Sequence, residues 1–557
     1  MKRILLIGGY GTFGGRLAQL LAPEDRLTLI IAGRSKAKAE TFCASLHGPA
    51  EKIPVAFDRD AFIENQLEEL KPDIVVDATG PFQSYGDNPY RVVKAAIARG
   101  VDYLDLADGT DFVKGISTFN TEAKEKNIFV LSGVSSFPVL TAAVLRRLAQ
   151  GLASVETIKA GIAPSPYAGV GLNVIRAIAG YAGKAVPVTR SGTKTAAYAF
   201  TETMNLTIAP PGRLPLHNTR FSLVDVPDLE VLPELWPGVQ DIWMGVGPVP
   251  EILHRMLNML AWLVRFKIVP SLAPLAELFS FVINHVRWGE HRGGMFVAIE
   301  GTGIDGKKVA RAWHLLAEGG DGPLIPSMAA AAIIGHCLAG NGPLAGARPA
   351  TGDLEIIDYD ALFATRTIYT GFWQAHPEDA PLYQRLLGDA WQTIPAVIRD
   401  MHNLKQNFQA EGRADIERGR GPIASFLCAF MGFPKAGQDV PVSVAFQLRG
   451  ETEMWERDFN GEKFRSYQSA GSGRSDRLLN ERFGLLTFGL ALVAESDRLR
   501  IIGRRWSLLG LPLPPFLMPR GDAYESAEGG RFHFHVDIKL PLVGRIVRYK
   551  GWLVPKS

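Results

Sequence analysis

The first 150 residues alternate between short apolar runs and segments whose apolar residues recur at helical spacing. Apolar runs at Ile4–Ile7 and Leu27–Ala32 enclose a glycine-rich turn and a segment with leucine and alanine at helical positions. Further strands are predicted at 54–57, 73–78, 102–106 and 128–131, and helices at 60–70, 88–99, 111–126 and 138–149. Strands separated by helices of this length are typical of a doubly wound parallel sheet in an α/β protein.

The pattern changes after residue 150. A helix is predicted at Leu172–Tyr181, a hairpin at Val186–Ala199, and a second hairpin from Met295–Glu300 and Val309–Ala317. We interpret residues 151–373 as an α+β domain for substrate binding and oligomerisation. The oligomer that we expect is a homodimer. The alanine-rich segment 326–338 is predicted to be a helix that returns to the first domain, because small residues allow close packing.

Residues 381–557 begin with helical segments and continue as alternating strands from about 442 to 553. One further helix is predicted at Ile423–Met431. This order predicts a mainly antiparallel β domain with helices, in which a curved sheet packs around a helix.

The glycine-rich turn fits the G-x-G-x-x-G pattern of a dinucleotide site. Gly9 makes the tight turn, Gly11 lets a pyrophosphate approach the backbone, and Gly14 lets the helix pack on the strand. The N-terminus of the following helix offers free N–H groups and a partial positive charge to phosphates. The cofactor-binding residues predicted here are Gly8, Gly9, Gly11, Thr12, Phe13 and Gly14. The motif and its flanking elements predict a Rossmann domain over residues 1–150.

The end of the second strand indicates which dinucleotide binds. An NAD site places Asp or Glu there, whereas this chain has Gly33, Arg34 and Ser35, with lysines close behind. A guanidinium can hold a 2′-phosphate through paired, charge-assisted hydrogen bonds, so these residues favour NADP(H). The alternative is that Arg34 lies in a solvated loop. Asp58, at the end of the next strand, is expected to meet the adenosine or to cap the following helix.

Composition excludes several other classes of protein. The chain has 557 residues, 47% of them apolar and 21% charged, which predicts two or three folded domains. Its net charge of +3 implies no nucleic-acid partner. Three scattered cysteines predict neither a disulfide framework nor a metal site. Because the chain starts directly with a strand, we expect no signal peptide and a cytoplasmic location.

The strongly apolar segment 252–286 leaves two interpretations open. Charged residues and prolines interrupt it, so no run reaches the roughly 20 apolar residues of a spanning helix. It can form two core or interface helices. Alternatively, it is a hairpin that lies on a bilayer, with Arg255, Arg265 and Lys267 at the headgroups and the protein peripheral to a membrane.

Five N-terminal segments resemble the saccharopine dehydrogenase-like (saccharopine reductase-like) oxidoreductases. They are Ile7–Gly14 with Ala32–Ser35, Val75–Phe82 with Tyr85–Gly86, and Gly100–Leu106. The C-terminal part resembles an uncharacterised domain fused behind a subset of these proteins, in the segments Glu481–Gly484, Leu509–Pro514 and Arg548–Trp552.

The resemblance implies NADP(H) as cofactor and a small-molecule substrate. It implies that Thr79, Gly80, Pro81 and Phe82 line the nicotinamide side of the site. Candidate proton-transfer groups are Tyr85, Asp105, Asp108 and His314, the first three at predicted carboxyl ends of strands. The resemblance thus predicts an NADP(H)-dependent oxidoreductase, and the hydrophobic middle of the chain and its strand-rich C-terminal part favour an apolar substrate. The alternatives are a catalytically silent NADP-binding scaffold or sensor, and a lipid-handling protein at a membrane surface.

Overall fold

The computed structural model describes residues 1–377 and 379–556, which form two compact units. Unit 1 comprises Met1–Met204 and Arg220–Ile368, and unit 2 comprises Asn205–Thr219 and the chain from Tyr369 onward. The parts predicted at 1–150 and 151–373 thus fall largely within unit 1, and the part predicted at 381–557 falls within unit 2.

Unit 1 begins with a parallel sheet whose strands run in the order β15-β6-β5-β4-β1-β2-β3. The strands are β1 (Lys2–Ile7), β2 (Leu27–Gly33), β3 (Glu51–Ala56), β4 (Ile74–Asp77), β5 (Asp102–Asp105), β6 (Phe129–Ser132) and β15 (Gly346–Pro349). β1 lies between β2 and β4, so the chain changes direction across the sheet beside the first glycine turn. Ligands bind at such a switch point, outside the carboxyl ends of the strands.

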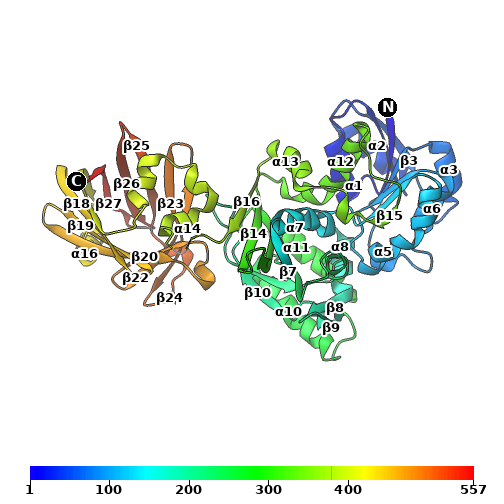
Figure 1. Ribbon diagram of the computed structural model, residues 1–557. Helices are drawn as coiled ribbons and strands as arrows, with labels where there is room; N and C mark the ends of the chain where they lie inside the picture. Colours follow the sequence, from blue (N-terminus) through cyan, green and yellow to red (C-terminus); the bar gives the residue numbers. More distant parts are fainter. Residues whose placement is uncertain (378, 557) are drawn as a thin grey trace. The chain divides into compact units, whose positions relative to one another are not determined.

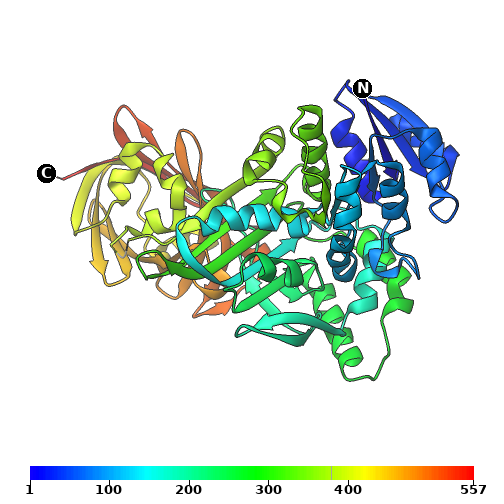
Figure 2. The same cartoon turned by 45° about the vertical axis from the view of Figure 1, so that its right-hand side comes forward.

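Helices cover this sheet, which confirms the predicted Rossmann fold (Figures 1 and 2). They are α1 (Thr12–Leu21), α2 (Lys36–Ser45), α3 (Ile63–Leu70), α4 (Arg91–Arg99), α5 (Thr110–Gly115), α6 (Asn120–Glu125), α7 (Thr141–Ala149) and α12 (Ile325–Leu338). The single helix predicted over 111–126 is wrong, because a 3-10 turn at Ile116–Phe119 separates α5 from α6. The backbone at Gly115 lies against Tyr90, where a Cβ would be 2.2 Å from the tyrosine oxygen.

The second sheet of unit 1 contains the strands β11-β12-β7-β13-β14 in that order. They are β7 (Leu152–Ala163), β11 (Thr219–Leu223), β12 (Asp241–Val246), β13 (Gly293–Gly303) and β14 (Lys308–Ala317). The other elements are the hairpin β8 (Ala185–Arg190) and β9 (Thr193–Tyr198), with α8 (Leu172–Tyr181), α9 (Asp228–Leu235), α10 (Glu251–Arg265), α11 (Ala276–His285) and α13 (Ile356–Ala364). β10 (Thr203–Leu206) and β16 (Ile368–Gln374) lie where the chain passes between units.

Unit 2 is an antiparallel sheet that closes on itself, because β22 also pairs with β23. Its strands are β17 (Phe408–Arg418), β18 (Gly437–Arg449), β19 (Thr452–Phe459), β20 (Glu462–Ala470), β21 (Leu479–Phe483), β22 (Leu486–Ala494), β23 (Arg498–Leu508), β24 (Leu511–Pro512), β25 (Arg520–Glu528), β26 (Arg531–Leu540) and β27 (Gly544–Pro555). Its helices are α14 (Leu382–Leu387), α15 (Ala396–His402) and α16 (Pro422–Met431). The predicted antiparallel β class is confirmed.

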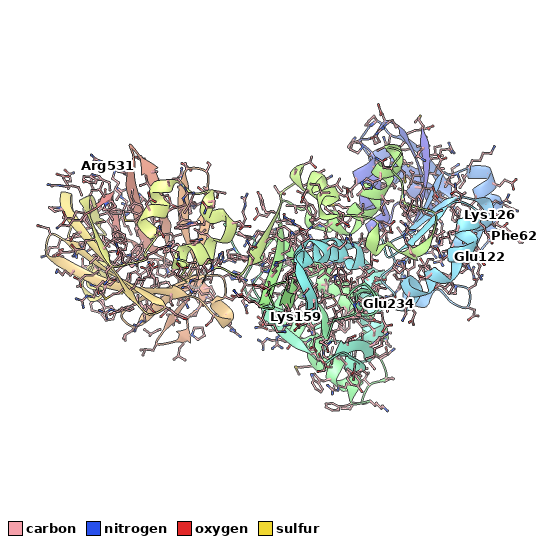
Figure 3. All side chains as sticks on the ribbon, in the orientation of Figure 1. Phe62, Glu122, Lys126, Lys159, Glu234 and Arg531 are labelled. Carbon is pink, nitrogen blue, oxygen red and sulfur yellow. The ribbon has the colours of Figure 1, made fainter. Side chains whose placement is uncertain are left out.

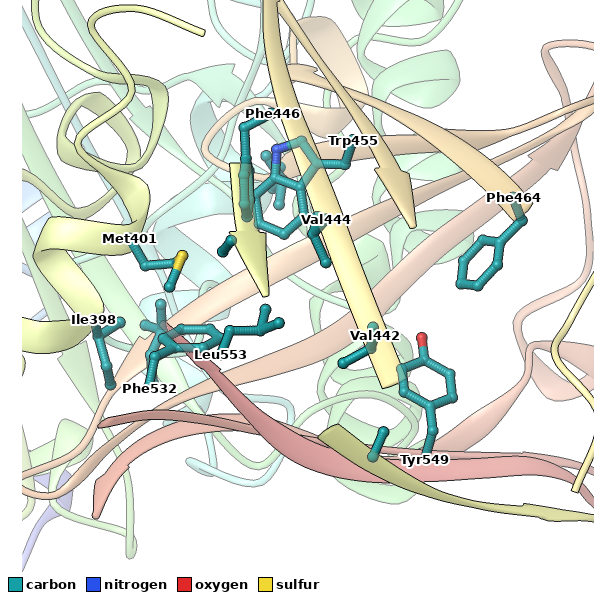
Figure 4. Packing of buried hydrophobic residues seen from close by; sticks show 14 of the residues in the cluster. Ile398, Met401, Val442, Val444, Phe446, Trp455, Phe464, Phe532, Tyr549 and Leu553 are labelled. Atoms are coloured by element: carbon teal, nitrogen blue, oxygen red, sulfur yellow. The ribbon is translucent and has the colours of Figure 1, made fainter. Parts of the chain in front are cut away.

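Aromatic and aliphatic side chains fill the interior of unit 2. Phe446 and Trp455 pack with their ring centroids 4.7 Å apart, and Met401 of α15 belongs to the same cluster (Figure 4). Buried polar groups join this core: the imidazole of His402 lies 2.6 Å from the carboxylate of Glu525. Both side chains are almost fully buried, at 0% and 7% exposure, so this pair forms part of the interior and not of the surface.

Candidate functional site

The glycines of the turn after β1 allow the backbone to pack closely there. Gly8 has φ +79°, a conformation that side chains other than glycine rarely adopt. A Cβ at Gly14 would lie 2.3 Å from the carbonyl oxygen of Gly8, and one at Gly9 would lie 2.8 Å from that of Leu6. The first turn of α1 therefore rests directly on the glycine turn.

The N-terminus of α1 keeps N–H groups free for a ligand. Among the described residues, no backbone carbonyl accepts from the N–H groups of Thr12 or Phe13. A cavity of about 430 Å³ lies beside them, and its lining includes Gly11, Thr12 and Arg16. Free N–H groups at the positive end of a helix next to a cavity fit the phosphates of a dinucleotide.

The segment before α8 crosses over the same end of α1. Arg16 donates to the carbonyl oxygen of Ala168 at 2.9 Å, and a Cβ at Gly171 would lie 2.8 Å from Oγ1 of Thr12. From the other side, Oγ of Ser327 in α12 donates to the carbonyl oxygen of Phe13 at 3.0 Å. Two segments far away in the sequence thus hold α1 where the phosphates are expected.

At the end of β2, Arg34 is exposed and makes no hydrogen bond or ion pair with any residue in 1–377 or 379–556. Ser35 caps α2 by accepting from the N–H of Lys38 at 3.3 Å. The ring of Tyr10 lies over Gly33, where a Cβ would be 2.5 Å from it, and its hydroxyl accepts from the N–H of Ser35 at 3.0 Å. Tyr10 thereby holds the strand end beside Arg34 in place.

Asp58 lies exposed in the loop after β3. Its carboxylate accepts from the N–H of Asp60 at 2.9 Å, so it closes a local turn, and the following helix begins later, at Ile63. The neighbouring Arg59 reaches the end of β4, where its guanidinium lies 3.5 Å from the ring centroid of Tyr85 and donates to Oγ1 of Thr79 at 3.3 Å.

The end of β4 carries a chain of hydroxyl and carboxylate groups. Oγ1 of Thr79 donates to the buried carboxylate of Asp77 at 2.6 Å. Because that proton is committed to Asp77, the hydroxyl of Tyr85, 2.6 Å away, donates to Thr79. Burial and the nearby Asp77 raise the pKa of Tyr85, and burial raises the pKa of Asp77. Tyr85 therefore keeps its proton and is linked to a buried acceptor.

Aromatic residues and one amide surround this chain of groups. Phe82 packs against Tyr85 and Phe112, with ring centroids 4.6 and 5.0 Å apart. Nδ2 of Asn173, in the first turn of α8, donates to the carbonyl oxygen of Gly80 at 2.9 Å. The loop Thr79–Phe82, which includes Pro81, is thus bounded by aromatic rings and by the second part of unit 1.

Asp105 and Asp108 lie at and just after the end of β5. Asp105 pairs with Asp77 across β4 and β5, and its Oδ1 accepts from the N–H groups of Ala107 and Gly133 at 3.0 and 2.8 Å. Burial raises the pKa of Asp105 to about 7. Burial also raises the pKa of Asp108, which accepts from Gln83 at 3.2 Å. Asp105 is 0% exposed, so it holds the strand ends together and does not face solvent.

His314 lies in the interior of the second sheet. It is 2% exposed in β14, opposite Phe296 of β13. This position places it among packed strands and not at the carboxyl ends of the parallel strands, where Tyr85, Asp105 and Asp108 lie.

Sequence reasoning missed several residues of the site. Tyr10, Arg59, Asp77 and Asn173 lie on four different segments, and all four contact the ends of β2 or β4. A usable signal existed for Asp77, which ends an apolar run, and for Arg59, which follows the strand end at Asp58. The sequence gives no signal for Asn173, because its role depends on how α8 packs.

Within residues 1–377 and 379–556, no group of three or more His, Cys, Asp or Glu residues is placed to hold a metal ion. No helix in the described part of the chain combines the length and apolar character needed to span a membrane.

Fold and site together define a Rossmann-type dinucleotide-binding protein. Residues 4–134 match the family model described as the saccharopine dehydrogenase NADP binding domain, and residues 394–553 match a domain of unknown function, DUF4166. The resemblance found in the sequence is thereby confirmed for both ends of the chain. The N-terminal match supports an oxidoreductase with a nicotinamide dinucleotide as its cofactor.

Solved structures show more distant likeness. Apo saccharopine dehydrogenase (L-Glu forming) from Saccharomyces cerevisiae is 13% identical, with 68% of this chain and 100% of that chain covered and a TM-score of 0.48. The WlbA (WbpB) dehydrogenase from Thermus thermophilus, in complex with NAD and alpha-ketoglutarate, is 15% identical, with coverage of 66% and 93% and a TM-score of 0.28. No curated protein matches the chain.

Proposed function

We propose that this protein is an NADP(H)-dependent oxidoreductase that acts on an apolar substrate. The observation that carries the choice of NADP(H) is Arg34, exposed at the end of β2 with no carboxylate partner among the described residues. A carboxylate at this position would repel a 2′-phosphate, whereas a free guanidinium can bind it in paired hydrogen bonds.

Several groups of the chain support binding of this cofactor. The free N–H groups of Thr12 and Phe13 are suited to the pyrophosphate, and Tyr10 holds the strand end that carries Arg34. When bound, a nicotinamide supplies the hydride chemistry. The chain then has to orient the reactants, exclude water and supply a proton.

Tyr85 is the group best suited to hold that proton. Its raised pKa keeps it protonated, and its hydroxyl has to exchange the hydrogen bond to Thr79 for one to the substrate in order to supply that proton. The guanidinium of Arg59 over its ring favours the phenolate that forms when the proton leaves. The aromatic rings of Phe82 and Phe112 beside it support an apolar substrate.

The cofactor is tested by calorimetric titration of the full chain with NADPH and with NADH. We expect NADPH to bind at least about tenfold more tightly, since charge-assisted hydrogen bonds each contribute about 1.5 kcal/mol or more. Equal affinity for the two cofactors, or a preference for NADH, contradicts the assignment.

The reaction is tested by following NADPH oxidation with a panel of apolar carbonyl and imine compounds. With a substrate that turns over, Tyr85→Phe is expected to lower kcat by about a hundredfold or more and to leave NADPH binding unchanged. Tyr90→Phe is the matched control, because its hydroxyl donates to the backbone carbonyl oxygens of Phe112 and Asp111, at 3.0 and 3.3 Å. Tight NADPH binding without any turnover supports the silent scaffold instead.

A further inference from the structure

α10 is an amphipathic helix whose apolar face points away from the protein. Its buried positions are His254, Asn258, Ala261 and Val264. Its exposed positions include Ile252, Met256 and Met259, with exposed fractions of 61, 54 and 70%, and Phe266, directly after the helix, is 64% exposed. Helices on the surface of a soluble protein normally show the reverse arrangement. The exposed fractions exclude the interpretation of this face as part of the core.

Hydrogen bonds fix this orientation. Nε2 of His254 lies 2.7 Å from Oγ of Ser222, and Nδ2 of Asn258 donates to the carbonyl oxygen of Phe200 at 2.9 Å. Burial lowers the pKa of His254 to about 4, so the imidazole is neutral at physiological pH. Turning the apolar face inward would leave these polar groups without partners, so the outward face is a property of the fold.

The loop after α10 and the start of α11 continue the apolar surface. We call residues 259–278 the hairpin tip; it joins the end of α10 to the first turn of α11. Trp262, Phe266, Ile268, Leu275 and Leu278 of the tip are 37, 64, 67, 36 and 56% exposed. The rings of Trp262 and Phe266 pack against each other, with centroids 5.4 Å apart, and large exposed apolar patches mark binding surfaces. α10 lies at the edge of unit 1 in Figure 1.

The charges around the tip are positive. Arg265 stacks on Trp262 at 4.5 Å from its ring centroid, and Lys267 is exposed; neither has a carboxylate partner among the described residues. The two acidic residues of the hairpin are already paired, Glu251 with Arg255 and Glu277 with Arg176. The tip therefore presents apolar side chains together with unneutralised cations.

We propose that the hairpin tip docks on the surface of an anionic lipid bilayer. Apolar side chains enter the boundary between headgroups and acyl chains, Trp262 lies at that boundary, and Arg265 and Lys267 meet lipid phosphates or carboxylates. A second copy of the chain fits less well, since a two-fold contact through this face would bring like charges together. The surface is independent of the reaction proposed above.

Vesicle flotation of the full chain tests the proposal. The probes are vesicles of phosphatidylcholine and phosphatidylserine in equal parts, and of phosphatidylcholine alone. The tip variant carries Met259→Ser, Phe266→Ser, Ile268→Ser and Leu278→Ser, at positions 56 to 70% exposed. We expect the wild type to float with the anionic vesicles, and the tip variant to bind them about a hundredfold or more weakly.

A matched control replaces as many exposed apolar residues elsewhere in unit 1. Phe62→Ser, Ile304→Ser, Leu344→Ser and Ile357→Ser affect side chains that are 84, 80, 82 and 68% exposed, and Figure 3 shows Phe62 at the surface. This control is expected to float like the wild type. Lys267→Gln should weaken binding several-fold in low salt and reduce its dependence on salt.

Three results would overturn the proposal. The first is a wild type that stays unbound with anionic vesicles, and the second is equal loss of binding in the tip and control variants. The third is a tip variant that changes the sedimentation of the protein from dimer to monomer without changing flotation, which would assign the face to a second copy of the chain.

A second measurement applies if the tip variant does not fold. Trp262 belongs to the tip, so vesicles with brominated acyl chains should quench its fluorescence. Trp262→Phe in the otherwise unchanged chain should remove the quenching that comes from Trp262. Identical quenching of wild type and Trp262→Phe excludes insertion of the tip.

Discussion

The side-chain amide of Asn173 donates a hydrogen bond to the carbonyl oxygen of Gly80 across 2.9 Å. Asn173 lies in the first turn of α8, which follows the first strand of the second sheet, and Gly80 lies in the loop after β4 of the parallel sheet. The bond ties the two halves of unit 1 together at the carboxyl ends of the strands. A substrate bound there would meet residues from both halves, as ligands of open α/β sheets do.

Replacing Arg34 tests the cofactor assignment at a single side chain. Arg34→Ala is expected to weaken NADPH binding by about ten- to a hundredfold, because the charge-assisted bonds to the 2′-phosphate are lost. NADH binding should change little. Calorimetric titration with both cofactors measures the two effects. Arg26→Ala is the control, since that exposed arginine precedes β2 and pairs with Glu24 at 2.7 Å; equal losses in both variants would refute a specific role for Arg34.

Gly14 is predicted to tolerate no side chain. A Cβ there meets the carbonyl oxygen of Gly8 at 2.3 Å, so Gly14→Ala must push α1 off the glycine turn. We expect a loss of about 2 kcal/mol or more in the free energy of unfolding of unit 1, together with loss of NADPH binding. Denaturant unfolding and titration check this outcome.

Gly180 in α8 provides the matched substitution for that experiment. Apart from the adjoining residues and the backbone of α8 itself, a Cβ at this position has no described atom within 4 Å. Gly180→Ala should therefore stabilise the protein by up to about 1 kcal/mol, because alanine is the better helix former. A Gly14→Ala variant as stable as Gly180→Ala would contradict the packing of α1 on the turn.

Asp105 should make stability depend on pH. Burial disfavours the carboxylate and raises the pKa of Asp105 from its ordinary value of 3.8 to about 7 in the folded protein. The folded state thus binds more protons than the unfolded state between these values, and stability falls as pH rises from about 4 to about 7. The full effect is on the order of 4 kcal/mol.

Asp105→Asn tests this dependence, since an amide oxygen can still accept from Ala107 and Gly133. Unfolding measured at several pH values should show a shallower fall for the variant than for the wild type. If the free energy of unfolding falls equally with pH in the wild type and in Asp105→Asn, a group other than Asp105 causes the pH dependence.

The buried pair of His402 and Glu525 is predicted to be important for the stability of unit 2. His402→Ala leaves the carboxylate of Glu525 buried without its partner, at a cost of about 3 kcal/mol or more. Hydrogen exchange of peptides from β25 and α15 in the full chain measures the local loss. The double variant His402→Ala and Glu525→Ala should cost less than the sum of the single changes.

A more exposed histidine, His533, is the control for the effect of burial on the stability loss. His533 lies 4.0 Å from Glu528, and the two side chains are 28 and 69% exposed. His533→Ala should change stability by less than about 1 kcal/mol. Similar losses for His402→Ala and His533→Ala would argue against a special role of the buried pair.

Much of the fold could be predicted because the signals are local. Apolar runs, helical spacing and the glycine pattern lie within short stretches, and they specified the strand, turn, helix and strand of residues 2–33. The prediction of one helix over 111–126 missed the 3-10 turn at Ile116–Phe119, and the close approach of Tyr90 to Gly115 likewise has no signal in that segment. The chain of Tyr85, Thr79 and Asp77 was only partly foreseen, because its geometry depends on how the strand end turns.

The amino-acid pattern by itself determined the fold class, the glycine turn, the absence of an acidic residue at the end of β2, and the presence of an apolar stretch around residues 252–286. Only the tertiary structure decided that Arg59 and Asn173 reach the end of β4, that Asp105 is fully buried, and that α10 turns its apolar side outward. The physical reason is that backbone propensities and periodicity act over a few residues, whereas burial, hydrogen-bond partners and the exposed side of a helix depend on segments that meet after folding.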